Sequence, residues 1–364
     1  MKIGILTFHR AENMGAVLQA YALQTYLTRI GQDVFIINYR PKSIERTYHI
    51  LNPYILFHEK NIVLSLRAYL KRFLTIYSRY RKKYLYKNFR KKYFHETNPM
   101  LTIEKPLNFD AYIVGSDQVW NMKLTKGMDD FFFLNFPVKS GALKVSYAAS
   151  SEYFSYDCIF QNKKRVKNLL EKFNSISVRE KSLQEVIERI TQKQISLCVD
   201  PTFLLSKEDY YKIAIRPKVK SYVLVYHMQE DSRSVDLAER IAKSKNIDVI
   251  EIHADFYRST NRKRHKIGLG PLELLGYIAY ADSVITTSFH GMALSIILQK
   301  NFWSFITSSS TRQLNLLEAL DLRSRMLENL YSFVSHDIDY SIVNRKIRLL
   351  IENSESFLQK SLNL

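Results

Sequence analysis

The sequence predicts an α/β protein with two Rossmann-like domains, each built on a doubly wound parallel sheet. Short β-branched runs alternate with longer stretches whose apolar residues recur at helical spacing, which is the pattern of parallel sheets. The alternation fills residues 1–205 and starts again over 206–335, and residues 336–364 predict a helical tail. A chain of 364 residues with 46% hydrophobic content is long enough for two such domains. We expect a functional site in the cleft between them.

The first domain opens with a strand over residues 3–8, a helix over 16–30 and a strand over 33–38. A dinucleotide fingerprint needs three spaced glycines in the first turn, and only Gly15 is present, so such a site is not supported. Asn13 and Gly15 offer backbone donors to a phosphate or a sugar hydroxyl. A simple tight turn explains the same residues, and both interpretations stay open.

Residues of about 41–100 break the alternation and predict a basic helical insertion in the first domain. No acidic residue falls between Arg67 and Lys92. An aromatic stripe can pack on the parent domain or contact an anionic bilayer, where tyrosine and lysine both favour the interface. Nucleic acid is the least favoured partner, because no helix-turn-helix, zinc-finger or RNP signature is present. The stripe at helical spacing comprises Leu66, Tyr69, Leu70, Phe73, Ile76, Tyr77, Tyr80 and Tyr84.

Polar and aromatic residues follow the strand predicted over 109–114. Asp117 and Gln118 can hydrogen-bond hydroxyl groups, and Trp120 can cover the apolar face of a sugar ring. Asp117 as a helix N-cap and Trp120 as a core residue are the alternatives. Because these residues stand together just past a strand end, we favour a carbohydrate site.

Three more strands complete the first domain, over 142–149, 175–178 and 195–199. Arg179 directly follows the second of them, so it either pairs with Glu180 or a neighbouring carboxylate, or clamps an anion. Asp200 precedes a proline, which favours a structural turn over a catalytic base.

The second domain is organised around residues 283–299, where a short strand runs through a polar turn into an apolar helix. The first turn of such a helix attracts anions, and Gly291 would let a ligand approach the backbone beside Ser288. His290 then stands where a proton donor could reach the ligand, although capping or a core hydrogen bond would also explain it. A basic loop over 258–266 could cover an anionic ligand. The other elements expected are strands over 222–227, 248–252 and 301–306 and helices over 232–245, 272–281, 291–300 and 342–358.

Composition limits the partners and the compartment. The formal net charge is +19, which implies an anionic partner. Two cysteines, the absence of a secretory signal at the N-terminus and the lack of an apolar run of about 18 residues favour the cytoplasm. No Asp-x-Asp motif and no histidine or cysteine cluster predicts a metal.

With these residues assembled, the chain resembles the polysaccharide pyruvyl transferase family. The matching stretches, in the expected order, are TFHRAENMGAVLQAYALQTYL, FDAYIVGSDQVWN, KVSYAAS, ISVREKS, CVDPTFLL and GPLELLGYIAYADSVITTSFHGMALSI. The resemblance implies a GT-B arrangement, with the acceptor on the first domain and the donor on the second. It also implies transfer of pyruvyl from phosphoenolpyruvate to two hydroxyls of a sugar, which in bacteria is often linked to a polyprenyl diphosphate carrier. A lipid carrier would place the protein peripherally on the inner face of the cell membrane.

The resemblance also suggests roles for single residues. Phosphoenolpyruvate is a co-substrate and no cofactor is implied. Arg179 and then Arg312 are expected to hold it, because hydrogen bonds to charged groups are worth about 1.5–3 kcal/mol each. His290 is the expected general acid, and Asp117 the base or an acceptor ligand. Some family branches have Arg-Leu-His where this chain has Ser288, Phe289 and His290, and we expect Arg312 to take the place of that arginine. A GT-B glycosyltransferase and a basic nucleic-acid-binding protein are the alternatives.

Overall fold

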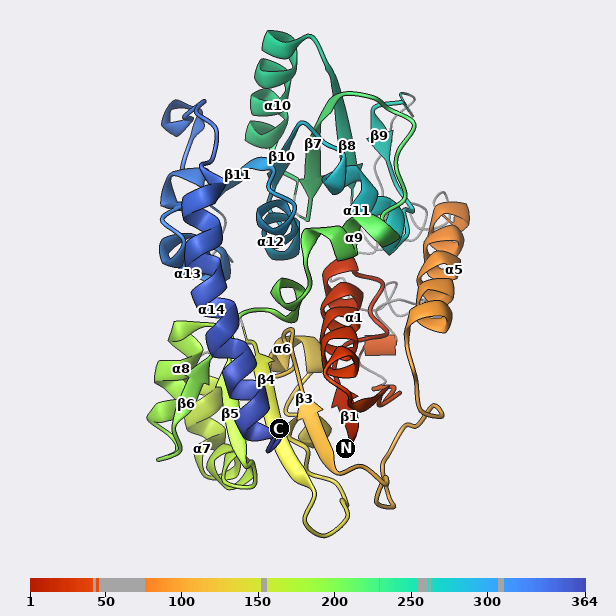
Figure 1. Cartoon of the computed structure of the whole chain (residues 1–364), viewed down its shortest axis with the longest axis vertical. Helices are drawn as coiled ribbons and strands as arrows, with labels where there is room; N and C mark the ends of the chain where they lie inside the picture. The colour runs from red at the N-terminus through yellow and green to blue at the C-terminus, as the bar shows by residue number, and fades with distance from the viewer. Residues whose placement is uncertain are drawn as a thin grey trace, which may run out of the picture.

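The computed structural model describes residues 1–41, 44–45, 76–151, 156–228, 230–253, 261, 263–306 and 311–364. Two sheets of six strands dominate it, one above the other in Figure 1. The strand orders are β2-β1-β3-β4-β5-β6 and β12-β11-β10-β7-β8-β9, and every pairing is parallel. Both predicted Rossmann-like sheets are therefore confirmed, and with them the GT-B-like class of two α/β units.

The first sheet lies within the first 200 residues. Its strands are β1 (Lys2–Leu6), β2 (Asp33–Ile36), β3 (Ala111–Val114), β4 (Leu143–Ala149), β5 (Ser175–Val178) and β6 (Ile195–Leu197). The α-helices along this part are α1 (Met14–Arg29), α5 (Ile76–Tyr93), α6 (Met122–Thr125), α7 (Tyr156–Leu170) and α8 (Lys181–Glu188), with short 3-10 helices η1 (Asp130–Phe133) and η2 (Pro201–Leu204).

The second sheet contains β9 and β12, which the sequence did not predict because two residues carry no usable periodicity. Its strands are β7 (Tyr222–His227), β8 (Asp248–His253), β9 (His265–Lys266), β10 (Ser283–Thr286), β11 (Asn301–Phe305) and β12 (Met326–Leu327). The helices here are α9 (Lys207–Ile213), α10 (Ser232–Lys245), α11 (Pro271–Ala279), α12 (Phe289–Ile297), α13 (Thr311–Ala319) and α14 (Tyr340–Ser361), with η3 (Arg323–Arg325) and η4 (Leu330–Ser332).

Helix α1 lies between the two halves and is buried on nearly all sides (Figure 1). Such a helix belongs to a core rather than to a surface. It packs against η2, α11 and α12, and one continuous hydrophobic cluster includes residues from both sheets. At its C-terminal end, Arg29 makes two hydrogen bonds of 2.7 Å to the carboxylate of Asp209 in α9. The halves are therefore joined through α1.

Helix α14 returns from the second sheet to the first, as Figure 1 shows. The backbone N–H of Val199 donates to the hydroxyl of Ser354 at 3.0 Å, and the rings of Tyr147 and Phe357 lie 6.4 Å apart. The tail predicted over 342–358 is thus a helix that ties its own end to the opposite half.

Helix α5 belongs to the basic insertion, for whose aromatic stripe the sequence left two alternatives open, packing on the parent domain or contact with a bilayer. Tyr86 and Phe89 are buried, whereas Tyr77, Tyr80 and Tyr84 are 79%, 64% and 56% exposed. The packing alternative therefore does not hold for these three tyrosines, and the alternative of bilayer contact stays open. The stripe residues Leu66, Tyr69, Leu70 and Phe73 lie outside the described residues.

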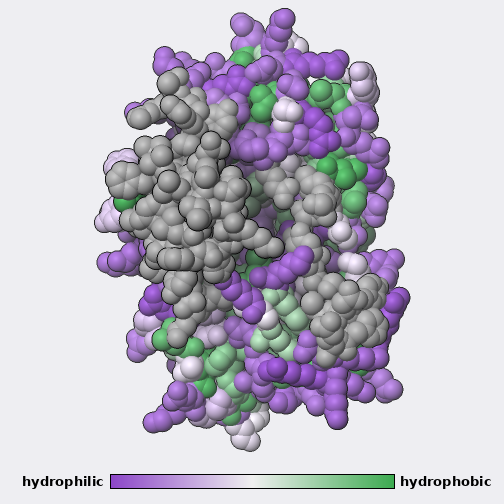
Figure 2. All heavy atoms as spheres, turned by 180° about the vertical axis from the view of Figure 1, so that it is seen from behind, coloured by the Kyte–Doolittle hydropathy of each residue, from purple (hydrophilic) through white to green (hydrophobic). Residues whose placement is uncertain are grey.

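Helix α5 also reaches the second half of the molecule. Arg81 donates to the carbonyl of Gly268 at 2.7 Å and pairs with Glu273 at the start of α11. None of the helices within the described ranges is long and apolar enough to span a membrane. The surface opposite to the view of Figure 1 is mainly hydrophilic in its described part (Figure 2).

Candidate functional site

Three of the predicted site residues, Asn13, Asp117 and His290, lie where the strand order of each sheet reverses. In open parallel sheets, ligands bind outside the carboxyl ends of the strands at such a switch point. The first sheet reverses at β1 and β3, which precede Asn13 and Asp117, and the second reverses at β7 and β10. His290 follows β10, so sequence reasoning and topology indicate the same edges.

His290 belongs to the first turn of α12, which begins two residues earlier than the sequence predicted. Ser288 is the N-cap and its hydroxyl accepts from the N–H of Gly291 at 3.2 Å. A Cβ on Gly291 would lie 2.6 Å from the hydroxyl of Thr286, so this glycine is needed for close packing inside the protein. The predicted opening for a ligand at Gly291 is therefore wrong, and Ser288 with Gly291 shapes the turn that presents His290.

The imidazole of His290 packs directly on the first turn of α1. A Cβ on Gly15 would lie 2.0 Å from Nδ1 of His290, so only glycine leaves room for the ring. Asn13 caps the same helix, and its side chain accepts from the N–H of Gly15 at 2.9 Å. The turn from Asn13 to Gly15 thus positions the histidine.

Asp200 faces the other side of the imidazole. Its Oδ2 lies 3.3 Å from Nε2 of His290, and its Oδ1 accepts from the N–H and the hydroxyl of Thr202 at 3.0 and 2.8 Å. The carboxylate is completely buried. Burial alone would raise the pKa of Asp200, but the charges of His290 and Arg179 outweigh it and hold the pKa well below the usual range. Asp200 is therefore an ionised partner for the histidine as well as the predicted turn residue.

Arg179 is paired inside the protein, which decides between the two alternatives that the sequence left open. Its guanidinium donates to Asp200, to Glu180 at 3.2 Å and to the hydroxyl of Ser150 at 2.9 Å. Burial alone would lower the pKa of Arg179, and the carboxylates of Glu180, Asp200 and Asp117 raise it. The prediction that Arg179 clamps phosphoenolpyruvate is not supported, because all three of its nitrogens already have protein partners.

Arg312 is the more accessible of the two predicted arginines and is half-buried near the start of α13. With the amide of Gln118 turned so that its oxygen faces the guanidinium, both terminal nitrogens of Arg312 donate to it at 3.1 Å. Arg312 also lies over the ring of Phe289, 5.7 Å from the centroid, while Arg179 lies over the same ring at 4.4 Å. The structure thus brings Gln118, Arg312 and the turn of His290 together.

The carbohydrate residues predicted after β3 separate into two groups. Asp117 and Gln118 are half-buried, and Asp117 has a φ of 68°, a conformation that side-chain-bearing residues rarely adopt outside special sites. Trp120 is 1% exposed, donates to the carbonyl of Phe132 at 2.8 Å and stacks on Phe133. The interpretation of Trp120 as a sugar platform is therefore wrong, and its core alternative is confirmed.

Sequence reasoning missed the buried network behind His290. Asp200 was interpreted as a turn, and neither Ser150 nor Glu180 was given a role at the site, although the hydroxyl of Ser150 donates to Glu180 at 2.6 Å. The signal that could have found them is position: parallel strands place the residues after β4, β5 and β6 side by side at one edge.

A second set of polar residues lies at the carboxyl end of the second sheet. Two groups among the described residues could hold a metal ion, namely His227, Glu230 and His253, and Glu251, His253 and His265. The sequence did not predict them, because they are spread over three strands.

Several solved structures are similar to this chain over nearly its full length. They include a UDP-GlcNAc 2-epimerase from Neisseria meningitidis bound to UDP-GlcNAc, with 11% identity, a TM-score of 0.44 and coverage of 100% of this chain and 94% of that chain. A spinosyn rhamnosyltransferase complexed with thymidine diphosphate has 11% identity, a TM-score of 0.40 and coverage of 100% and 95%. A putative UDP-N-acetylglucosamine 2-epimerase from Listeria monocytogenes has 7% identity, a TM-score of 0.47 and coverage of 99% and 90%.

No curated protein matches the chain. The sequence profile described as polysaccharide pyruvyl transferase matches residues 13–309, a range that begins at the N-cap of α1 and contains Gly15, Arg179, Asp200 and His290. The residues that meet around the imidazole therefore all fall inside the matched segment, and the chain belongs to the polysaccharide pyruvyl transferase family.

Proposed function

We propose that this chain transfers the pyruvyl group of phosphoenolpyruvate to two hydroxyls of a sugar in a surface or capsular polysaccharide precursor, forming a cyclic ketal and inorganic phosphate. The observation that carries the proposal is the contact of His290 with both Asp200 and Gly15. It joins the carboxyl edges of the two sheets around one imidazole, inside the segment that matches the family.

The reaction needs one proton on carbon and the loss of phosphate. Protonation of C3 of the enol makes C2 electrophilic, and one sugar hydroxyl forms a C–O bond to C2 and loses its proton. The second hydroxyl then forms a C–O bond to C2 as the C2–O bond to phosphate breaks. One hydroxyl proton returns to the acid that protonated C3, and the other leaves with phosphate, so atoms and charge balance.

His290 is the proposed proton donor, and Asp200 its positioning residue. Positioned acids and bases contribute about 10²–10⁴-fold to rate. One guanidinium, Arg179, pairs with two carboxylates, Asp200 and Glu180, so this network leaves one formal negative charge beside the imidazole of His290. Arg179 acts on this network and does not touch substrate.

Arg312 is the proposed cation for phosphoenolpyruvate. Its planar fork suits phosphate and carboxylate groups, and it is half-buried over the ring of Phe289, the residue before His290. We assign the donor to the half built on the second sheet, about residues 206–335, and the acceptor to residues 1–205. Asp117, Gln118 and Asn13 are the proposed acceptor contacts.

We further propose that the protein works peripherally at the inner face of the cell membrane, on a lipid-linked acceptor. The α5 outer face, defined by Tyr77, Tyr80, Lys83, Tyr84, Lys87 and Lys91, is exposed and contains no acidic residue. Tyrosine favours the membrane interface, and each lysine near an anionic surface is worth about 1 kcal/mol. An anionic bilayer is the occupant that this composition favours.

The deciding experiment compares donors. The chain is incubated with a sugar acceptor and either phosphoenolpyruvate or a nucleotide sugar, and released phosphate, released nucleotide and ketal are measured together. Phosphate and ketal in equal amounts support the proposal. Release of nucleotide from the nucleotide sugar would instead identify a glycosyltransferase. If neither reaction occurs and DNA binding persists after substitution of His290, the protein is a nucleic-acid-binding protein.

A further inference from the structure

Five side chains form a cluster on one face of the second sheet, which we call the histidine cluster. Parallel pairing aligns His227 of β7 with His253 of β8, and Glu251 of β8 with His265 of β9. Glu251 and His253 are two residues apart in one strand, so both point to the same face. Sheet register therefore brings together residues far apart in the sequence, and Glu230 joins them from the loop after β7.

Three atoms of the cluster have the spacing of a metal site. Nε2 of His253 lies 3.1 Å from Nδ1 of His265, and Oε2 of Glu251 lies 3.9 and 3.8 Å from these two nitrogens. Zinc binds nitrogen and oxygen at about 2.0–2.2 Å, so two ligands of one tetrahedral ion lie about 3.3–3.5 Å apart. The observed distances lie on both sides of that value, and small side-chain movements suffice to bring all three atoms to the spacing of zinc ligands.

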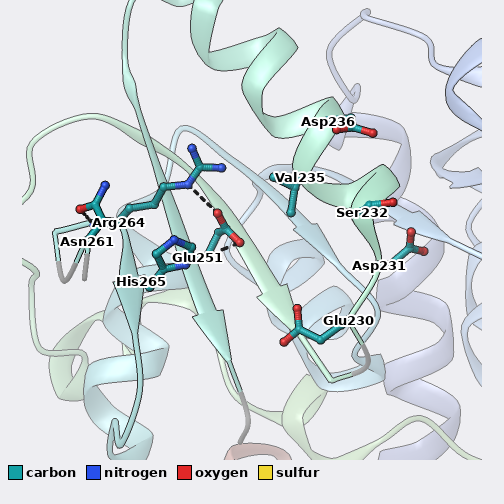
Figure 3. A pocket seen from close by; sticks show the side chains of 9 residues that line it. All are labelled: Glu230, Asp231, Ser232, Val235, Asp236, Glu251, Asn261, Arg264 and His265. Carbon is teal, nitrogen blue, oxygen red and sulfur yellow. Dashed lines mark hydrogen bonds and ion pairs between the residues drawn. The ribbon is translucent and has the colours of Figure 1, made fainter. Parts of the chain in front are cut away.

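The neighbouring side chains hold two of these groups in orientations that suit a metal. Nδ1 of His253 lies 2.7 Å from Oε1 of Glu230, the carboxylate–histidine contact that usually orients a metal-binding imidazole. Arg264 donates to Oε1 of Glu251 at 2.5 Å, which turns Oε2 toward the histidines. Figure 3 shows the carboxylate of Glu251 beside both Arg264 and His265, with a dashed line to Arg264, and Glu230 farther away.

His227 gives an independent indication of a ligand. It is 2% exposed, and neither ring nitrogen has a hydrogen-bond partner among the described residues. Its Nε2 faces the same Oε2 of Glu251 at 3.6 Å, and its ring stacks on His253. Buried polar groups are nearly always hydrogen-bonded, and an exception often marks an ion or water that belongs there. This imidazole, whose nitrogens make no hydrogen bond of ordinary length, is directed at the cluster.

A pocket of about 540 Å³ opens beside these residues (Figure 3). Its lining includes Glu230, Glu251, Arg264 and His265, together with Asp231 and Ser232 at the start of α10. An ion held at its wall would keep one coordination position open to water or a small ligand, as catalytic zinc sites do. Two nitrogens and one carboxylate suit zinc, whereas magnesium and calcium prefer oxygen ligands only.

We infer that Glu251, His253 and His265 bind one divalent transition-metal ion of the zinc type, with its fourth coordination position facing this pocket. Glu230 orients His253 from behind. This site goes beyond the proposed pyruvyl transfer, which requires no metal step, and it uses none of the residues assigned to that reaction.

The test uses the full-length chain without a polyhistidine tag, stripped with a chelator and dialysed. Zinc is added alone, bound metal is measured by mass spectrometry, and the affinity is measured by competition with a chelating dye. We expect about one zinc per chain. His265→Ala and Glu251→Gln should abolish it, and Glu230→Gln should weaken it about 10–100-fold because only the orienting contact is lost.

His336→Ala is the matched control, because His336 is exposed and lies outside the cluster. It should bind zinc as the unaltered chain does. Circular dichroism establishes that each variant is folded. If His265→Ala or Glu251→Gln does not fold, Glu230→Gln alone tests the site, since Glu230 is 60% exposed and its substitution should not disturb the fold. Absence of stoichiometric zinc in the unaltered chain, equal binding in His265→Ala and Glu251→Gln, or magnesium binding of equal strength would overturn the inference.

Discussion

Nε2 of His290 lies 3.3 Å from Oδ2 of Asp200, and the two residues follow strands of different sheets. Their contact depends on how α12 meets η2 across the junction, where α1 also packs. Any change that shifts one half against the other therefore changes the environment of the imidazole.

Replacing His290 by alanine should lower the turnover of phosphoenolpyruvate about 10²–10⁴-fold, because the proposed proton donor to C3 is lost. Phosphate release in the presence of acceptor is the measurement, with circular dichroism to establish folding. His336→Ala, at an exposed histidine, should keep full activity. Unchanged turnover in His290→Ala would remove this residue from the mechanism.

Asp200→Asn keeps the shape of the side chain but removes its charge. The buried guanidinium of Arg179 then loses one of its two carboxylate partners, which should cost about 3–5 kcal/mol of unfolding free energy. Turnover should also fall, since His290 loses the carboxylate that holds its ring in position. Urea denaturation and phosphate release measure the two effects. The exposed ion pair of Asp110 with Lys139 provides the control, and Asp110→Asn should change neither the unfolding free energy nor the turnover.

Gly15→Ala tests the packing of the histidine on α1. The added methyl would lie 2.0 Å from Nδ1 of His290 and must displace the ring, so turnover should fall nearly as far as in His290→Ala. Alanine stabilises a helix by about 1 kcal/mol relative to glycine, so a weaker α1 helix could not explain the loss of turnover. Full activity of Gly15→Ala would show that the ring position does not matter.

His9 should make the fold sensitive to mild acid. It is buried, and burial lowers its pKa from 6.5 to about 4, although contacts with Thr7 and Asn38 raise it in part. As the pH falls, the unfolded chain binds the proton first, so this contribution to stability is present above about pH 6.5 and is lost as the pH approaches 4. The loss amounts to about 3 kcal/mol. Between pH 6.5 and 4, the urea concentration at the unfolding midpoint should fall less steeply with pH for His9→Gln than for the unaltered chain. Identical slopes would show that His9 does not cause the acid sensitivity.

The α5 outer face predicts membrane association. Changing Lys83, Lys87 and Lys91 to alanine should weaken binding to vesicles that contain anionic lipid by about 3 kcal/mol, or about two orders of magnitude. Activity on a soluble acceptor should be unchanged. The charge-matched control replaces Lys164, Lys167 and Lys181, which are exposed outside α5. Equal vesicle binding by both triple variants would show that net charge alone, rather than this face, carries the interaction.

Local pattern was enough for most of the fold. Buried strands such as Tyr222–His227 and amphipathic helices such as Ser232–Lys245 were predicted with the bounds that the structure shows, because apolar periodicity and flanking turn residues are local properties. Family motifs likewise located His290. The tyrosine stripe of α5 could not be assigned from the sequence, since aromatic residues at helical spacing do not reveal whether that face is covered.

The sequence by itself determined the class of fold, the family and the position of the candidate proton donor. Only the tertiary structure decided that Arg179 is a paired internal residue, that Asp200 is the partner of His290, and that Glu251, His253 and His265 meet on one sheet face. The physical reason is that charge pairing and metal geometry act over a few ångströms in space. Residues separated by tens or hundreds of positions reach that range only after the strands have aligned.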